Sequence, residues 1–112
     1  MNYVIKHYHT KEIMFRHECN SMKECVEEAV RRGVDLDSCN LAYAKLRGAN
    51  LMGAQLSHSY LTCVDMRDAD LRGADLHGAW LDMAFLQRAD LRGADVRGSR
   101  IDEADTSECR VR

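Results

Sequence analysis

The chain has 112 residues, of which 46% are hydrophobic and 30% charged, and this length allows one domain with a modest core and excludes a second. Its formal net charge of −2, from 16 Lys and Arg against 18 Asp and Glu, excludes direct binding to nucleic acid or to a membrane through an overall positive field. The five cysteines have no CxxC spacing, which excludes the paired framework of a secreted scaffold, and no apolar run is long enough to cross a bilayer, so we expect a cytoplasmic protein without a secretion signal.

Residues 1–33 predict a small cap of mixed α and β structure, which begins with a hairpin. Two short apolar runs, 3–5 and 13–15, have the composition of strands. A polar stretch near His9–Lys11 lies between them and predicts the turn. We therefore expect a β-hairpin at the start of the chain.

A helix is expected next, at residues 22–32. Ser21 with Glu24 three residues later forms a capping box, and apolar residues then recur at helical spacing until Gly33 ends the helix. Its apolar face needs a partner in the region that follows. We expect it to cover the first turn of that region, because an uncovered end exposes core residues and unpaired strand edges.

From residue 34 onward an apolar residue recurs at every fifth position almost without exception. The series is Leu36, Leu41, Leu46, Leu51, Leu56, Leu61, Met66, Leu71, Leu76, Leu81, Leu86, Leu91, Val96, Ile101, Thr106 and Val111. Two positions before each of these stands a small residue, Ala, Ser or Cys, except at Val34 and Val64. A period of five fits neither a helix nor a strand, whereas a coil with four five-residue sides turns all these residues inward. Stacking such coils buries a continuous core.

This pattern resembles the A(D/N)LXX motif of the pentapeptide-repeat family, which stands here at 49–51, 69–71, 74–76 and 89–91. The resemblance extends over about residues 34–112. It implies an all-β solenoid, a right-handed quadrilateral β-helix of about four coils with the small α+β cap at its N-terminal side. The coils would be 34–53, 54–73, 74–93 and 94–112. Glycines at the fifth place of a unit would lie at corners, where a positive φ is tolerated best: Gly48, Gly53, Gly73, Gly78, Gly93 and Gly98.

Residues 20 apart would stack in such a fold, so four outer faces can be assigned from the sequence. Face 1 comprises 34–38, 54–58, 74–78 and 94–98; face 2 comprises 39–43, 59–63, 79–83 and 99–103; face 3 comprises 44–48, 64–68, 84–88 and 104–108; face 4 comprises 49–53, 69–73, 89–93 and 109–112. Face 1 is acidic and face 3 is balanced. Face 4 repeats Arg72, Arg92 and Arg112 in register, and its Asp and Arg columns are expected to pair across neighbouring coils.

Face 2 carries exposed aromatic residues, which have no place in a core filled by Leu. Tyr60 is expected beneath Trp80, with Tyr43, Cys63 and Met83 along the edge of the face. Exposed patches rich in Trp, Tyr and Met are typical of protein contacts; alternatively, the rings shield one another and buttress the coils. The candidate partner-binding residues are Tyr43, Tyr60, Trp80, Met83, Phe85, Asp35, Asp75, Asp95, Asp82 and Asp102.

The resemblance also implies a class of partner. Some pentapeptide-repeat proteins mimic the shape and charge of duplex DNA and bind topoisomerases. Duplex DNA carries one charge per roughly 1.7 Å, far more than the few net negative charges of residues 34–112, so only a partial imitation by faces 1 and 2 is expected. The short cap is also similar to small family members of bacteriophages and mobile elements. We therefore expect a non-enzymatic protein-interaction module that inhibits or modulates a topoisomerase-like enzyme or a DNA-binding defence complex.

The alternative is a structural or self-assembling scaffold, a homodimer through the last coil or the aromatic face. In that last coil Val96, Ile101 and Val111 are covered only by the short segment 106–112, and a simple polar termination by Arg110 and Arg112 is the other possibility.

We expect no catalytic residue, cofactor or metal site. A coil filled by Leu and Ala offers no pocket in which catalytic groups could converge, the histidines are scattered, and no cysteines have metal-ligand spacing. Cys39 and Cys109 take the small inward place and are expected to be inert, whereas Cys63 is expected nearer the surface.

Overall fold

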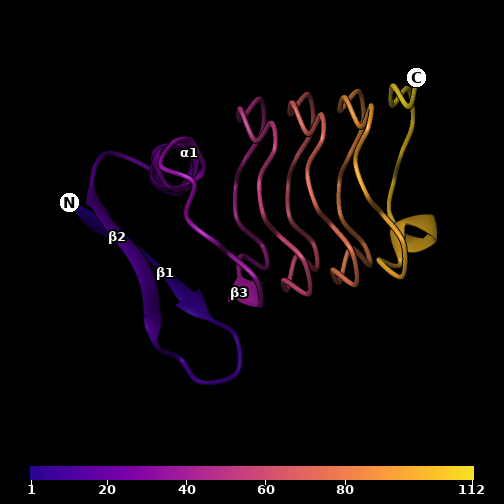
Figure 1. Cartoon of the computed structure of the whole chain (residues 1–112). Coiled ribbons are helices and arrows are strands. Elements are labelled where there is room, and N and C mark those ends of the chain that lie inside the picture. The colour runs from indigo at the N-terminus through magenta and orange to yellow at the C-terminus, as the bar shows by residue number, and fades with distance from the viewer.

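The computed structural model of the chain describes all 112 residues. It begins with an antiparallel hairpin of β1 (Asn2–His7) and β2 (Ile13–Glu18). The hairpin is confirmed, and its strands are longer than the apolar runs because the pairing continues outward to Asn2 and Glu18. The loop between the strands extends beyond the rest of the molecule (Figure 1).

Helix α1 (Met22–Arg31) follows the hairpin and ends one residue before the predicted boundary. The Ser21 side chain accepts a hydrogen bond from the backbone N–H of Glu24, and the Glu24 carboxylate accepts one from the N–H of Asn20. These two reciprocal bonds are the predicted capping box, which satisfies N–H groups that a helix start leaves free.

The hairpin is joined to the repeats through one sheet. The short strand β3 (Cys39–Asn40) pairs antiparallel with β1, with Lys6 opposite Asn40, so the strand order is β2-β1-β3. Because β3 belongs to face 2, the hairpin pairs with the first unit of this face.

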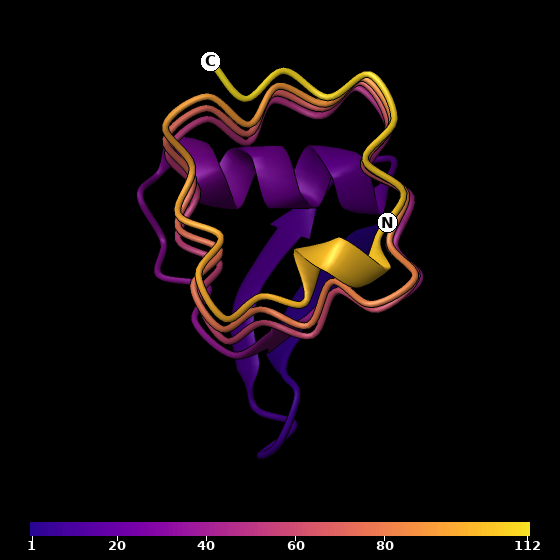
Figure 2. The same cartoon turned by 90° about the vertical axis from the view of Figure 1, so that its right-hand side faces the viewer.

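The repeats form a four-sided coil. Parallel β-bridges join residues 20 apart, from Asp35 with Gln55 to Asp90 with Arg110, and the stacked coils have a nearly square outline across which α1 lies (Figure 2). Each side contributes one bridged residue, so no strand longer than β3 forms in this region. The 20-residue register confirms the predicted period, whereas the division into four coils stays a prediction.

One core runs through the cap and the repeats. The inward aliphatic residues from Leu36 to Leu91 are at most 5% exposed, and Ile5 of β1 with Cys25, Val26 and Ala29 of α1 belong to the same cluster. Burying a Leu side chain contributes roughly 1.5–3 kcal/mol, so the cap is held on the repeats mainly by this shared apolar contact.

The corners of the repeats share one turn geometry, except the corner at Glu103 in the last coil. The N–H of the small residue donates to the carbonyl of the inward residue three positions earlier, as Ala74 does to Leu71 at 3.0 Å. The third residue of the turn has a positive φ, between 67° and 74° at the six predicted glycines. Tyr43, Cys63 and Met83 adopt the same conformation with φ between 58° and 65°. Stacking in register therefore imposes this backbone even where the side chain disfavours it.

The last coil departs from the repeat on face 2. Arg100, rather than the expected fifth-place residue Glu103, has the positive φ of 58°, and a short 3₁₀-helix η1 (Ile101–Glu103) follows. The N–H of Leu81 consequently bonds to the Ser99 carbonyl, and no bridge joins Trp80 to Arg100. The expectation of an unbroken repeat is wrong here, because the chain turns before the unit is complete.

None of the helices has the length and apolar character that a bilayer crossing requires.

Candidate protein-binding surface

Three aromatic rings from distant parts of the sequence line up along face 2. We call Tyr8, Tyr60 and Trp80 the aromatic column. Ring centroids are 6.4 Å apart between Tyr8 and Tyr60 and 6.2 Å apart between Tyr60 and Trp80, the latter pair meeting edge to face at 83°. Such pairs contribute about 0.5–1.5 kcal/mol beyond their burial. The predicted stacking of Tyr60 and Trp80 is confirmed.

Two different elements build the column. Tyr60 and Trp80 occupy the same place in successive coils and are joined by a parallel bridge. Tyr8 comes directly after β1, and its backbone N–H donates to the Ser38 carbonyl at 2.9 Å. The hairpin thus continues the column past the first coil. Sequence reasoning missed Tyr8, because the only signal would have been the pairing of β1 with β3, which no local pattern encodes.

The column borders a hollow in the surface. Tyr8, Tyr60 and Trp80 line a cavity of about 200 Å³. Tyr8 is 37% exposed, Tyr60 36% and Trp80 41%. A large apolar surface thus remains in contact with water although the core beneath is fully packed.

Arg100 lies over the Trp80 end of the column, and three unpaired carboxylates belong to the same face of the repeats. The guanidinium carbon of Arg100 lies 4.3 Å from the centroid of the Trp80 ring, a cation–π contact. Asp82, Asp102 and Glu103 belong to the same face, and none of them forms an ion pair. Asp82 accepts a hydrogen bond from the Thr62 hydroxyl at 3.1 Å. The three carboxylates and one guanidinium leave this region with a net charge of −2.

The other predicted aromatic residues lie at the edge of this surface. Tyr43 and Met83 sit at the corner between faces 2 and 3 and are 71% and 66% exposed. The neighbouring Cys63 thiol raises the pKa of Tyr43. Met83, Phe85 and Asp102 line a second, open groove. The structure therefore places Tyr60 and Trp80 at one hollow, and Met83, Phe85 and Asp102 at a second groove.

The acidic residues predicted on face 1 have intramolecular partners. Asp35 accepts the N–H of Asp37 at 3.0 Å, Asp75 that of His77 at 3.0 Å, and Asp95 that of Arg97 at 3.1 Å. Asp70, Asp90 and other units repeat this bond to the residue two positions on. It explains why the motif prefers Asp or Asn, whose side-chain oxygen fixes the corner. These face 1 carboxylates lie outside the hollow of the aromatic column.

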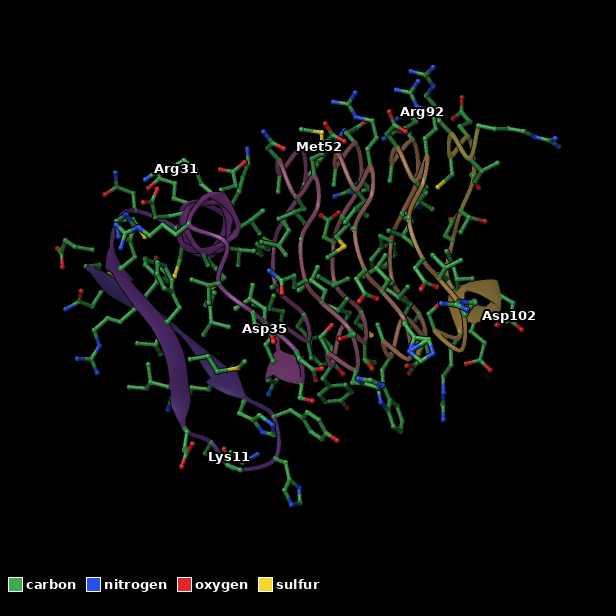
Figure 3. All side chains as sticks on the ribbon, in the orientation of Figure 1. Lys11, Arg31, Asp35, Met52, Arg92 and Asp102 are labelled. Carbon is green, nitrogen blue, oxygen red and sulfur yellow. The ribbon has the colours of Figure 1, made fainter.

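On face 4 the two shortest ion pairs each lie within a single five-residue unit. Arg72 lies 2.7 Å from Asp70, and Arg92 lies 2.6 Å from Asp90, whereas the contact of Arg72 with Asp90 in the next coil is 3.9 Å long. The expected pairing across neighbouring coils is present on face 4 only as this longer contact, because the Asp-X-Arg spacing already places both groups of one unit together. Figure 3 shows Arg92 at the edge of the coils far from Asp102. Bidentate pairing neutralises much of face 4 and leaves unpaired carboxylates around face 2.

The structure brings together no metal-binding cluster, and two of its cysteines are deeply buried. No group of three or more His, Cys, Asp or Glu side chains is placed to hold a metal ion. Burial raises the pKa of the Cys39 thiol to about 12 and that of Cys25 to about 11. Both thiols are therefore protonated at neutral pH and unreactive.

Comparison with known families gives a match over most of the chain. The family model described as pentapeptide repeats matches residues 28–51, 49–84 and 69–105, in eight copies. No curated protein matches.

Solved structures of similar proteins include two from cyanobacteria. One is the pentapeptide repeat protein Rfr23 from Cyanothece 51142, with 26% identity over 70% of this chain and a TM-score of 0.37. Another is HetL from Nostoc sp. strain PCC 7120, a pentapeptide repeat protein involved in heterocyst differentiation regulation, with 30% identity over 63% of this chain and a TM-score of 0.33. The matched regions span 60% and 33% of those proteins.

Proposed function

The chain belongs to the pentapeptide-repeat family, and from this premise we propose that it is a non-enzymatic protein-binding module that contacts its partner through face 2. Proteins of this family are right-handed quadrilateral β-helices that generally serve interaction or structural roles and are generally not enzymes. The observation that carries the proposal is the aromatic column, whose rings stay about two-fifths exposed above a filled core.

The physics of association favours this surface. Trp and Tyr supply most binding energy at protein interfaces when they fill a partner's pocket. The column is held by backbone bridges and by the hairpin, so little conformational freedom is lost on binding. A rigid, apolar and partly hollow surface of this kind supports a specific contact.

The buttress role suggested by the sequence predicts a different result on mutation. If Tyr60 and Trp80 served only to stabilise the coils, their removal would lower the free energy of unfolding without a separate effect on binding. Under the proposal, variants that remain folded recover less of the partner than the wild type does. Denaturation and capture measured on the same variants therefore separate the two roles.

Capture from a host lysate tests the proposal. Immobilised full-length protein is compared with a Tyr60→Ala, Trp80→Ala double variant, and Met52→Ala serves as control because Met52 is 51% exposed on face 4. We expect proteins recovered by the wild type and by Met52→Ala, but lost with the double variant, as quantified by mass spectrometry. Equal recovery by all three folded proteins would remove face 2 as the contact surface.

The partner's contacting surface is proposed to be basic. The unpaired carboxylates Asp82, Asp102 and Glu103 on the same face as the column complement positive charge. Enzymes and defence complexes that bind DNA present such surfaces, so partial DNA mimicry remains the finer form of the proposal. It predicts that excess duplex DNA releases the captured partner. Retention of the partner in excess DNA would restrict the proposal to a contact unrelated to DNA binding.

Self-assembly is a second candidate, favoured by one observation. Leu91, Val96, Ile101 and Val111 line an apolar groove of about 350 Å³ at the last coil. A second copy covering this groove would bury these side chains. Sedimentation at several protein concentrations tests this, and a monomer at the highest concentration would exclude it.

A further inference from the structure

The guanidinium of Arg100 is a cation that contacts the aromatic column. It lies over the Trp80 ring at 4.3 Å, although Asp102 and Glu103 follow it within η1. Arg100 forms an ion pair with neither of them. The regular bridge is also missing at this point, so a side chain rather than backbone covers the outer side of Trp80. The chain itself thus supplies a cation to the ring.

We propose that face 2 binds an arginine side chain of an extended partner segment, whose guanidinium takes the place of Arg100 on Trp80. This inference rests on the proposed function and names the chemistry of the partner. A guanidinium stacks on aromatic faces and is more weakly hydrated than an ammonium, so arginine is preferred to lysine at such a site.

The charges of face 2 favour an incoming cation. Asp82, Asp102 and Glu103 have no cationic partner, and the single positive charge of Arg100 leaves the region negative. On face 4, by contrast, Asp70 and Asp90 are each bound by an arginine of their own unit. An arginine of a partner therefore finds unpaired carboxylates on face 2, the face that carries the column, and none of that kind on face 4.

Arg100 has the character of an internal competitor. It occupies the ring in the free protein, and its displacement exchanges one cation–π contact for another. Removing it frees the ring and takes away one positive charge, so affinity for an external guanidinium increases. If Arg100 instead formed part of a binding site for an acidic group, the same substitution would weaken binding.

The single tryptophan of the chain, Trp80, makes the test direct. Its fluorescence is followed while full-length protein is titrated with end-blocked hexamers of arginine, lysine or citrulline at low salt. We expect a saturable change with the arginine hexamer, binding at least about threefold weaker with lysine, and no saturation with neutral citrulline. Equal binding of the arginine and citrulline hexamers, or none with arginine, would overturn the inference.

Three variants that retain Trp80 complete the test. Arg100→Ala is expected to tighten binding of the arginine hexamer about three- to tenfold, and Tyr60→Ala to weaken it. Asp102→Asn is expected to weaken it more than Glu108→Gln, which removes one carboxylate from face 3 of the same coil. Weaker binding by Arg100→Ala would show that the hexamer does not displace Arg100 from Trp80. Equal effects of the two charge variants would show an unspecific electrostatic attraction. Either result would contradict the proposal.

The outcomes are distinguishable from those of the lysate experiment. If the hexamers fail but the Tyr60→Ala, Trp80→Ala variant still loses its captured protein, the arginine inference is wrong and the proposed function stands. If the arginine hexamer binds as expected but capture is unaffected by the double variant, the binding chemistry is supported and the proposed function is wrong.

Discussion

The Glu27 carboxylate in α1 accepts a hydrogen bond from the backbone N–H of Asn50 at 2.8 Å. One coil further on, the equivalent N–H of Asp70 donates to the carbonyl of Ala49, and that of Asp90 to Ala69. Asn50 has no preceding coil beneath it, so a helix side chain takes the place of the missing backbone. The cap therefore covers the first coil with a hydrogen bond as well as with apolar contacts.

Glu27→Ala is expected to lower the free energy of unfolding by about 0.5–1.5 kcal/mol, because the Asn50 N–H loses its acceptor. Glu27→Gln keeps a side-chain oxygen and should lose less. Urea denaturation followed by circular dichroism measures both, and equal losses would show that the charge of Glu27, rather than its hydrogen bond, stabilises the cap.

Met83→Gly is expected to raise stability by about 0.5–1 kcal/mol. Met83 holds a φ of 61° and is 66% exposed, so glycine relieves backbone strain at the cost of little packing. Met52→Gly is the matched control, since Met52 is also exposed but has no positive φ, and it should lower stability. Thermal unfolding of both variants checks the sign, and a loss in Met83→Gly would contradict the argument.

Ser99→Ala is expected to raise the free energy of unfolding by about 1 kcal/mol. The Ser99 hydroxyl is buried without a hydrogen-bond partner, whereas the Ser59 hydroxyl in the equivalent inward place donates to the Leu56 carbonyl at 2.6 Å. Ser59→Ala should therefore be destabilising by comparison. Chemical denaturation measures the change in the free energy of unfolding for each variant. The prediction requires the two changes to have opposite signs.

Acid is expected to destabilise the protein between about pH 4 and pH 2. The Arg92 guanidinium lowers the pKa of Asp90 from 3.8 to about 2, and Arg31 with Arg32 lowers that of Glu28 from 4.5 to about 2. A carboxylate with a lowered pKa in the folded state stabilises it above the unfolded pKa, and this contribution is lost as the pH falls through the folded value. The two carboxylates are only 16% and 17% exposed, but their arginine partners are 71% and 36% exposed, so salt screens the effect in part.

The Asp90→Asn variant tests the origin of this pH dependence. The amide oxygen can still accept the Arg92 N–H, but the titrating charge is gone. We expect its stability to vary less between pH 4 and pH 2 than that of the wild type, as followed by urea denaturation at each pH. An unchanged pH profile would show that Asp90 contributes nothing to acid sensitivity.

The repeat, its 20-residue register and the inward residues could be predicted from the sequence, because a strict period of five allows the apolar residues only one common side. Leu36 to Leu91 follow that rule. The capping box of α1 was equally readable, since Ser21 and Glu24 act within a few residues of each other. Each of these features depends on local spacing alone.

The candidate site was only half predictable. Tyr60 and Trp80 stack because they lie 20 residues apart, which the period reveals. The corner at Arg100 broke the period although the aliphatic pattern continued through Ile101. A side chain's contact with a ring, such as that of Arg100 with Trp80, depends on this irregular turn, and periodic reasoning does not describe it.

By itself, the sequence determined which residues between 36 and 91 are buried, which residues share a face and where the regular corners lie, because repeated spacing acts the same way in every regular unit. The tertiary structure decided that β1 docks on face 2, bringing Tyr8 to Tyr60, and which carboxylates remain unpaired. These features arise where the regular repeats contact a different element: the hairpin beside the first coil and η1 in the last coil. Contacts between unlike elements follow from the packing of the whole chain, which no single interval in the sequence encodes.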